Sequence, residues 1–247
     1  MRALVALVAL FVLALAFAAL TPATLVDARI VATTAGQVRL AAAEGTVWSG
    51  HGLLWGPGGA WQLPVAWRLD PLELLRGGLR VQLVPAGDAS ARGVVQVRED
   101  AVNAENLHVA LPAAALTSAW TKAPAPQLAG TVTVDAPTLH ADRTRVDGSF
   151  RARWTTARVV YAGVLLDLGN VEANGQPQGG ALDIALHGEG GDVGIDGHAR
   201  VEGNVASVDA TLVPAPTLPP AMAMLLRALG PATADGGVRV TWRQAWR

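Results

Sequence analysis

The stretch GALDIALHGEGGDVGIDGHARVEGNVASVDATLV, residues 180–213, alternates apolar and polar side chains and is interrupted by glycines. A period of two is typical of half-buried antiparallel strands. Dipeptides such as Gly190-Gly191 and Gly203-Asn204 favour two-residue hairpin turns, because glycine and asparagine adopt positive φ at little cost. The stretch therefore predicts three antiparallel strands joined by two hairpins.

These two turns set a register that gathers the apolar side chains on one face. Leu182 is expected opposite Ala199, and Ala199 opposite Val208. A slip of one residue would scatter this set over both faces. The large apolar members of the face form a candidate apolar groove: Leu182, Ile184, Ile195 and Val208.

The same register places a polar row on the opposite face. Asp183 is expected beside His198, and His198 beside Asp209. Carboxylates flanking an imidazole suit general acid/base catalysis or a metal site. A solvated cross-strand ladder of charges is the simpler interpretation. We favour the ladder, because the sequence offers no nucleophile, third histidine or metal-type spacing beside the row.

Similar alternation recurs in GLRVQLV, NLHVALP and GTVTVD, while helical signals are few. Asp70 and Pro71 begin a short helical segment that stops at Gly77. A second amphipathic segment spans residues 218–230. The expected fold class is mainly β: an elongated antiparallel sheet, curled or groove-forming, with one or two short helices. A proline-rich segment near residues 122–130 divides it into two halves.

The N-terminus adds a membrane segment to this fold. No charged side chain occurs from Ala3 to Val26, and a helix of that length crosses a hydrocarbon core of about 30 Å. The apolar run is longer than that of a cleavable signal peptide, although AFA at residues 16–18 resembles a cleavage site. We expect residues 1–26 to be an N-terminal transmembrane anchor, and residues 27–247 to form the β-rich domain.

Composition and motifs exclude several functions. The 247 residues carry a formal net charge of -1 and no cysteine. A balanced charge gives no field to hold a phosphate backbone, so no nucleic-acid partner is expected. Phosphate-loop, H-E-x-x-H and G-x-S-x-G motifs are absent from the sequence. We expect no enzyme activity, no cofactor and no metal.

Two aromatic segments allow more than one interpretation. Residues 44–61 contain Trp48, Trp55 and Trp61, which we expect to be core or inter-strand plugs rather than one stacking surface; subunit contact is the alternative. Residues 238–247, VRVTWRQAWR, alternate as a strand. As a helix they would instead align tryptophan and arginine for a lipid headgroup layer.

Two motifs carry a resemblance to a known family. GTVWSG, followed by VAWRLDPLELLRGGL, resembles the N component of bacterial type II secretion systems (general secretion pathway protein N). In that family G-T-x-W-x-G precedes W-R-x-x-P-x-x-L-L-x-G-x-L. The matching signature residues are Gly45, Thr46, Trp48, Gly50, Trp67, Arg68, Pro71, Leu74, Leu75, Gly77 and Leu79.

The resemblance implies a single-pass protein of the bacterial inner membrane whose C-terminal β domain lies in the periplasm. It implies an accessory role in exporting folded proteins across the outer membrane, with other type II secretion subunits as partners. The signature residues then become expected subunit contacts, and no catalytic residue is carried over.

A second hypothesis comes from the apolar face of the sheet. Groove proteins of the AsmA type, which carry lipids across the periplasm, look similar in their alternation. Few helices are available to cover the apolar face here. The alternative function is therefore a periplasmic lipid-binding or lipid-transfer groove protein, with lipid as the partner.

Overall fold

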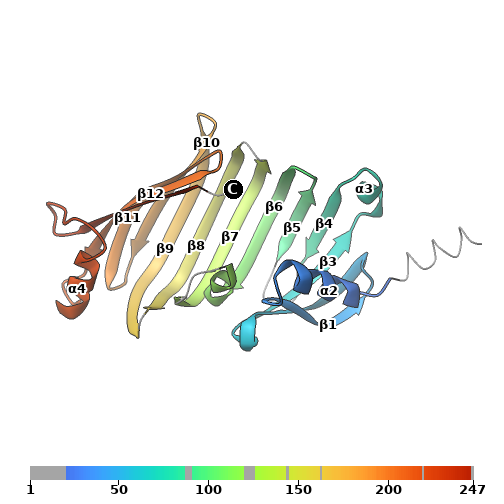
Figure 1. Cartoon of the computed structure of the whole chain (residues 1–247), viewed down its shortest axis with the longest axis horizontal. Helices are drawn as coiled ribbons and strands as arrows, with labels where there is room; N and C mark the ends of the chain where they lie inside the picture. Colours follow the sequence, from blue (N-terminus) through green and yellow to red (C-terminus); the bar gives the residue numbers. More distant parts are fainter. Residues whose placement is uncertain are drawn as a thin grey trace, which may run out of the picture.

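A single antiparallel sheet organises the chain. The computed structural model describes residues 21–86, 91–119, 126–142, 145–161, 163–218 and 220–245. In these residues thirteen strands pair in sequence order, each antiparallel to the next (Figure 1). The first and last strands are the two edges, so the sheet does not close on itself. The predicted mainly β, antiparallel fold is confirmed.

The strands are short near the N-terminus and longest in the middle of the sheet. They are β1 (Arg39–Gly45), β2 (Ser49–Trp55), β3 (Gln62–Leu69), β4 (Leu79–Val84), β5 (Arg92–Val97), β6 (Ala101–Pro112), β7 (Gln127–Asp142), β8 (Val146–Tyr161), β9 (Val164–Gln178), β10 (Ala181–Glu189), β11 (Val193–Glu202), β12 (Val205–Pro214) and β13 (Val238–Ala245). The described helices are α2 (Thr24–Thr33), α3 (Pro71–Leu75) and α4 (Pro220–Arg227), with short 3₁₀ segments η1 (Pro57–Gly59) and η2 (Ala113–Ala119).

Bulges with a glycine on the neighbouring strand bend the sheet. Asn106 in β6 has φ 48°, and a Cβ on Gly93 of β5 would lie 2.8 Å from its carbonyl oxygen. Thr156 in β8 also has φ 48°, and Gly130 of β7 lies against its backbone in the same way. The register shifts at both places. Because a bulge raises the local twist, these pairs curl the sheet about its long direction.

Two helices cover opposite ends of one sheet face, which we call the inner face. Helix α2 packs on β1 to β3, where Val26 and Ile30 contact the cluster around Leu40 and Trp67. Helix α4 packs at the other end, where Leu226 lies against Val193 and Val238. The helices predicted at residues 70–77 and 218–230 are thus present as α3 and α4.

One predicted hairpin register is correct and the other is wrong. The turn at Gly203-Asn204 pairs Ala199 with Val208, as expected. In the preceding hairpin Leu182 pairs with Val201, two residues away from the predicted partner. A shift of two keeps every side chain on its predicted face.

The loop at Gly190-Gly191 explains this shift, because it docks onto the sheet instead of forming a two-residue turn. Asp192 donates its N–H to the carbonyl of Asp167 at 2.7 Å and accepts from Ala215 N at 2.9 Å. A Cβ on Gly191 would lie 2.5 Å from the backbone nitrogen of Gly169. These tertiary contacts with β9 and the end of β12 lengthen the connection.

The expected membrane segment lies mostly outside the described residues, which begin at residue 21. No helix in the described ranges is both long and apolar enough to span a bilayer. The expected domain boundary after residue 26 falls within α2. Strands β6 and β7 pair directly, so one sheet continues across the expected division near residues 122–130, of which 122–125 are not described.

Asp27 fastens α2 to the first edge of the sheet. Its carboxylate accepts a hydrogen bond from Arg39 Nη2 at 2.8 Å and one from the Leu40 N–H at 2.7 Å. These two bonds, with that from Arg39 the stronger, lower the pKa of Asp27 below its ordinary value. The bond from Leu40 also satisfies a backbone N–H at the free edge of β1, which points away from β2.

Asp27→Ala should therefore loosen α2. We expect the free energy of unfolding to fall by about 1.5–3 kcal/mol at pH 7, the usual range for hydrogen bonds to a charged group. Because the folded pKa is depressed, this stabilisation is present above the ordinary carboxyl pKa of about 3.9 and is lost as the pH falls through the folded value. Urea unfolding at pH 7 and at pH 3 measures both effects.

Asp196→Ala is the matched control, since the Asp196 side chain is 81% exposed. An equal loss in both variants, or a loss for Asp27→Ala that does not shrink at pH 3, would contradict the assignment.

Candidate functional site

The paired inner-face positions of the sheet carry no charged side chain in any described strand. Pairing from strand to strand places the following residues on one face: Leu40, Trp67, Val134, Leu182 and Val238. Every paired residue on it is apolar or glycine until Gln244 near the end of β13. A binding surface on this face is therefore apolar over the whole sheet.

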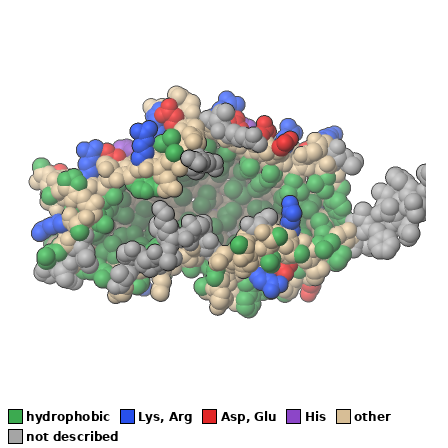
Figure 2. All heavy atoms as spheres, in the orientation of Figure 1, with side chains coloured by type: hydrophobic (Ala, Val, Ile, Leu, Met, Phe, Trp, Pro, Cys, Tyr) green, Lys and Arg blue, Asp and Glu red, His purple; other side chains and the backbone are tan. Residues whose placement is uncertain are grey.

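The inner face is hollowed between its two helix-covered ends. Figure 2 shows apolar side chains lining a broad hollow in the middle of the molecule, with charged side chains gathered along its rim. Figure 1 shows α2 in front of the first strands and α4 beyond the opposite end of the sheet. The hollow therefore follows the inner side of the middle strands, which α2 and α4 do not reach; the 3₁₀ segment η2 lies in front of their ends.

A groove of about 560 Å³ lies at the N-terminal end of this face. The α2 side chains Val26 and Ile30 form one wall, and Leu54, Trp67 and Val81 line the sheet side. Almost all of the lining is apolar, and its polar members are Thr21 and Arg29. This lining suits an apolar chain and offers little for a polar substrate to bind.

Sequence reasoning did not assign a groove to this region. Residues up to 26 are predicted to lie in the membrane segment, so the sequence predicts no contact between α2 and the sheet. The available signal was the alternation of Leu79, Val81 and Leu83, which places three apolar side chains on one face of β4.

The first signature motif builds the corner that supports Trp67. Thr46 closes a tight turn by donating its N–H to the carbonyl of Ser49 at 2.9 Å. A Cβ on Gly50 would lie 2.7 Å from Trp67 Cζ2, so only glycine leaves room for the indole. Trp67 is 7% exposed and donates from Nε1 to the carbonyl of Val47 at 2.9 Å. Gly45 is equally constrained, at φ +91° with the Ser49 carbonyl close by.

The second signature motif forms the β3–α3 connection. Asp70 accepts from the Leu72 N–H at 2.9 Å and caps α3, Pro71 begins the helix, and Gly77 follows it at φ +75°. Arg68 lies exposed on the outer face, and Leu74 is 43% exposed. The side chain of Leu75 is outside the described set. The motif therefore has structural members and surface members.

The three tryptophans of residues 44–61 have different environments. Trp61 is 7% exposed and lies against Gly56, as expected for a core residue. Trp55 is 38% exposed on the outer face, opposite Gln62, so its prediction as a buried plug is wrong. Trp48 is half-buried, and its carbonyl accepts from the Leu69 N–H at 2.7 Å.

The predicted groove residues share the inner face at the C-terminal end of the sheet. Leu182 is 4% exposed, and the other three are half-buried: Ile184, Ile195 and Val208. They belong to the same uncharged face as the N-terminal groove, but they lie at the opposite end of the sheet.

The predicted row of Asp183, His198 and Asp209 does not form as expected. The corrected register pairs Asp183 with Arg200, whose Nη1 donates to both carboxylate oxygens at 3.0 and 3.1 Å. Asp209 does lie opposite His198, but it binds Arg239. That hydrogen bond is the main cause of the lowered pKa of Asp209. The row is a ladder of exposed ion pairs.

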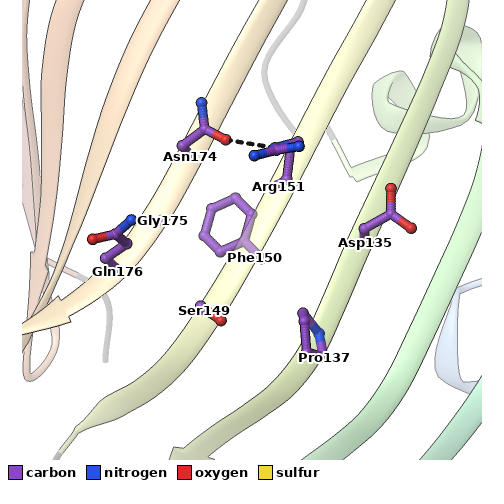
Figure 3. A pocket seen from close by; sticks show the side chains of 8 residues that line it. All are labelled: Asp135, Pro137, Ser149, Phe150, Arg151, Asn174, Gly175 and Gln176. Atoms are coloured by element: carbon purple, nitrogen blue, oxygen red, sulfur yellow. Dashed lines mark hydrogen bonds between the residues drawn. The ribbon is translucent and has the colours of Figure 1, made fainter.

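The outer face also has a depression of about 340 Å³ across β7, β8 and β9 (Figure 3). In Figure 3 Arg151 and Asn174 point toward each other, and Arg151 Nε donates to Asn174 Oδ1 at 3.0 Å. Asp135, on the next strand, binds His108 Nδ1 at 2.6 Å. These polar groups already bind one another. In the described ranges no three His, Asp or Glu side chains lie close enough together to hold a metal ion.

The comparisons with known proteins identify one family. A family model described as type II secretion system (T2SS), protein N matches residues 36–241. No curated protein and no solved structure matches the chain. The matched range runs from the loop after α2 into β13 and includes both signature motifs.

Gly50→Ala should destabilise the domain, because its methyl group would lie 2.6 Å from the Glu44 carbonyl and 2.7 Å from the Trp67 ring. We expect a loss of about 1–3 kcal/mol, the usual cost of overpacking. Gly194→Ala is the control, since its nearest neighbour would be 3.7 Å away. Chemical denaturation measures both. Equal stability of the two variants would contradict the role given to Gly50.

Proposed function

Because this chain belongs to the type II secretion system protein N family, we propose that it is an inner-membrane-anchored accessory component of that system. Family membership makes it a secretion component; the anchoring and the role are our inference. In this role it supports export of folded proteins from the periplasm across the outer membrane by holding other subunits in place. The family match over residues 36–241 is the observation that carries the proposal.

The proposed arrangement follows the order of the chain. We propose that the membrane anchor lies within the expected residues 1–26, before the part that packs on the sheet, since Ala23 and Val26 already contact the first strands. The rest of the chain, expected as residues 27–247, forms the periplasmic β-rich domain. The uncharged run from Ala3 to Val26 supports the anchor. We propose no catalytic role.

The signature motif supplies the proposed subunit contacts. Arg68 and Leu74 are signature residues with exposed side chains near α3, whereas Gly50 and Trp67 are needed to build the corner beneath them. An exposed leucine on a short helix suits an apolar contact in a small interface. The surface members of the motif are therefore the positions at which contact can be separated from folding.

Lipid binding is the second candidate function, and the hollow of the inner face favours it. A face without charge at any paired position, hollowed between α2 and α4 in the described residues, has the character of a groove for acyl chains. The 560 Å³ groove beneath α2 is its best-defined part. Arg29, which also lines this groove, suits the anionic headgroup of an amphiphile.

Deleting the gene should cause secreted enzymes to accumulate in the periplasm, with normal secretion restored by the full-length chain. On this background Leu74→Asp should fail to restore secretion, because a carboxylate replaces an exposed apolar contact. Leu72→Asp should restore it, since Leu72 is 61% exposed on the same helix but outside the signature. The ratio of periplasmic to secreted enzyme, at native expression, measures all three strains.

Unchanged secretion after deletion would rule out the proposed function. Restoration by both leucine variants would rule out α3 as the contact.

Val81→Trp should fill the groove beneath α2 and reduce binding of a fluorescent fatty acid to the purified full-length protein by about tenfold, the effect of losing roughly 1.4 kcal/mol. Gln82→Trp is the control, because Gln82 is the next residue of β4 and lies on the outer face. Fluorescence titration measures the affinity of each variant. Equal affinities in both variants would count against the lipid function.

A further inference from the structure

The second edge of the sheet presents unpaired backbone groups. The N–H of Arg239 points away from β12 and donates to the carbonyl of Pro231 at 2.9 Å. Antiparallel pairing alternates along a strand, so Thr241, Arg243 and Ala245 direct their N–H and C=O groups to the same side. Residues 231–233 cover the start of β13, and in the described part of the chain no backbone hydrogen bond covers this side of residues 241–245.

The opposite edge of the sheet is closed. The segment before β1 occupies its outward groups: Asp27 accepts from the Leu40 N–H at 2.7 Å, and Ala23 donates to the Gly45 carbonyl at 3.2 Å. Proteins commonly cover an edge in this way to prevent unwanted pairing. The two edges of the sheet therefore differ: the β1 edge is covered, and the β13 edge is open in the described residues.

The side chains of the open edge are apolar on one face and basic on the other. On the inner face Trp242 is 48% exposed. On the outer face Arg239 binds Asp209 with Nε at 2.8 Å, and Arg243 lies opposite Ser207 of β12. Residues 238–245 contain no acidic side chain.

A second copy of the chain does not suit this edge. Antiparallel pairing of two β13 strands centred on residue 243 would place Arg243 opposite its own copy with no carboxylate in residues 238–245 between them, and like charges facing across strands are destabilising. Pairing of β13 with β1 of another copy is blocked, because α2 and Asp27 occupy the β1 edge. Both routes to self-association are therefore unfavourable.

We propose that the edge of β13 at residues 241–245 binds an extended segment of a partner protein, which adds a further antiparallel or parallel strand to the sheet. This segment alternates apolar side chains, which cover Trp242, with acidic side chains, which meet Arg243. Backbone hydrogen bonds provide affinity in this mode, and the alternate side chains provide specificity. The added strand also extends the uncharged inner face beyond Trp242.

Two synthetic peptides test the proposal with the full-length protein. One is Thr-Val-Glu-Val-Glu-Val-Glu-Val-Thr with a fluorescent label, and the other has lysine at the three glutamate positions. Fluorescence anisotropy at low salt should show at least tenfold tighter binding of the glutamate peptide. Hydrogen exchange should show new protection of the Thr241 and Arg243 amides when that peptide is bound.

Two variants separate the backbone contribution from the charge. Arg243→Pro removes an outward N–H without removing a hydrogen bond to β12, so it should abolish binding. Arg243→Ala keeps the edge and should reduce affinity for the glutamate peptide toward that of the lysine peptide. If the melting temperature shows that the proline variant does not fold, Arg243→Ala alone still tests the contribution of the charge.

Equal affinity for the two peptides, binding of neither peptide, or protection confined to residues outside β13 would overturn the proposal. The outcome is independent of the secretion assay. Loss of secretion on deletion together with no peptide binding would reject the edge site while leaving the secretion function intact.

Discussion

Alternation along each strand, combined with in-order pairing of all described strands, is the constraint on which the structure depends. Pairing carries the face of each strand to its neighbour, so a single charged residue at an inner position would interrupt the apolar surface. The charged residues instead lie on the outer face, in cross-strand pairs such as Arg153 with Glu172 at 2.7 Å. Exposed pairs of this kind contribute little stability each. Their effect is to fix which face is polar.

Helix α2 connects several features of the molecule. It covers the inner face near Trp67, forms one wall of the N-terminal groove, and closes the β1 edge through Asp27. The other edge has no equivalent in the described residues beyond the short segment at 231–233. The two ends of the sheet therefore differ: one edge is covered by its own chain, and in the described residues the other keeps unpaired backbone groups. Such a difference suits an assembly component that is fixed at one end.

The sequence predicted the faces of the sheet well and its detailed contacts poorly. A two-residue period is local, so the shared face of Leu182 and Val208 and the hairpin at Gly203-Asn204 could be recognised. The preceding hairpin was wrong because Gly191 packs against a distant strand, and such a contact has no local signature.

Position within the sheet limited the prediction of individual sites in the same way. The pairing of Asp183 with Arg200 followed from the corrected register, and the exposure of Trp55 depended on which face it occupied. The groove beneath α2 could not be predicted, because part of that helix was expected to belong to the membrane segment. The signature residues were recognisable as a pattern, but their division into supporting and surface members required the contacts of Gly50 and Trp67.

The described inner face is an uncharged surface that is hollowed between α2 and α4, and acyl-chain binding is the second candidate function that we propose for it. Photocrosslinking in living cells at two neighbouring residues of β10 tests it most directly: Ile184 on the inner face and Ala185, which is exposed on the outer face. A benzoylphenylalanine at position 184 should yield lipid adducts, detected by mass spectrometry of the purified full-length protein, and one at position 185 should yield none. Lipid adducts at neither position, or equal adducts at both, would contradict the claim.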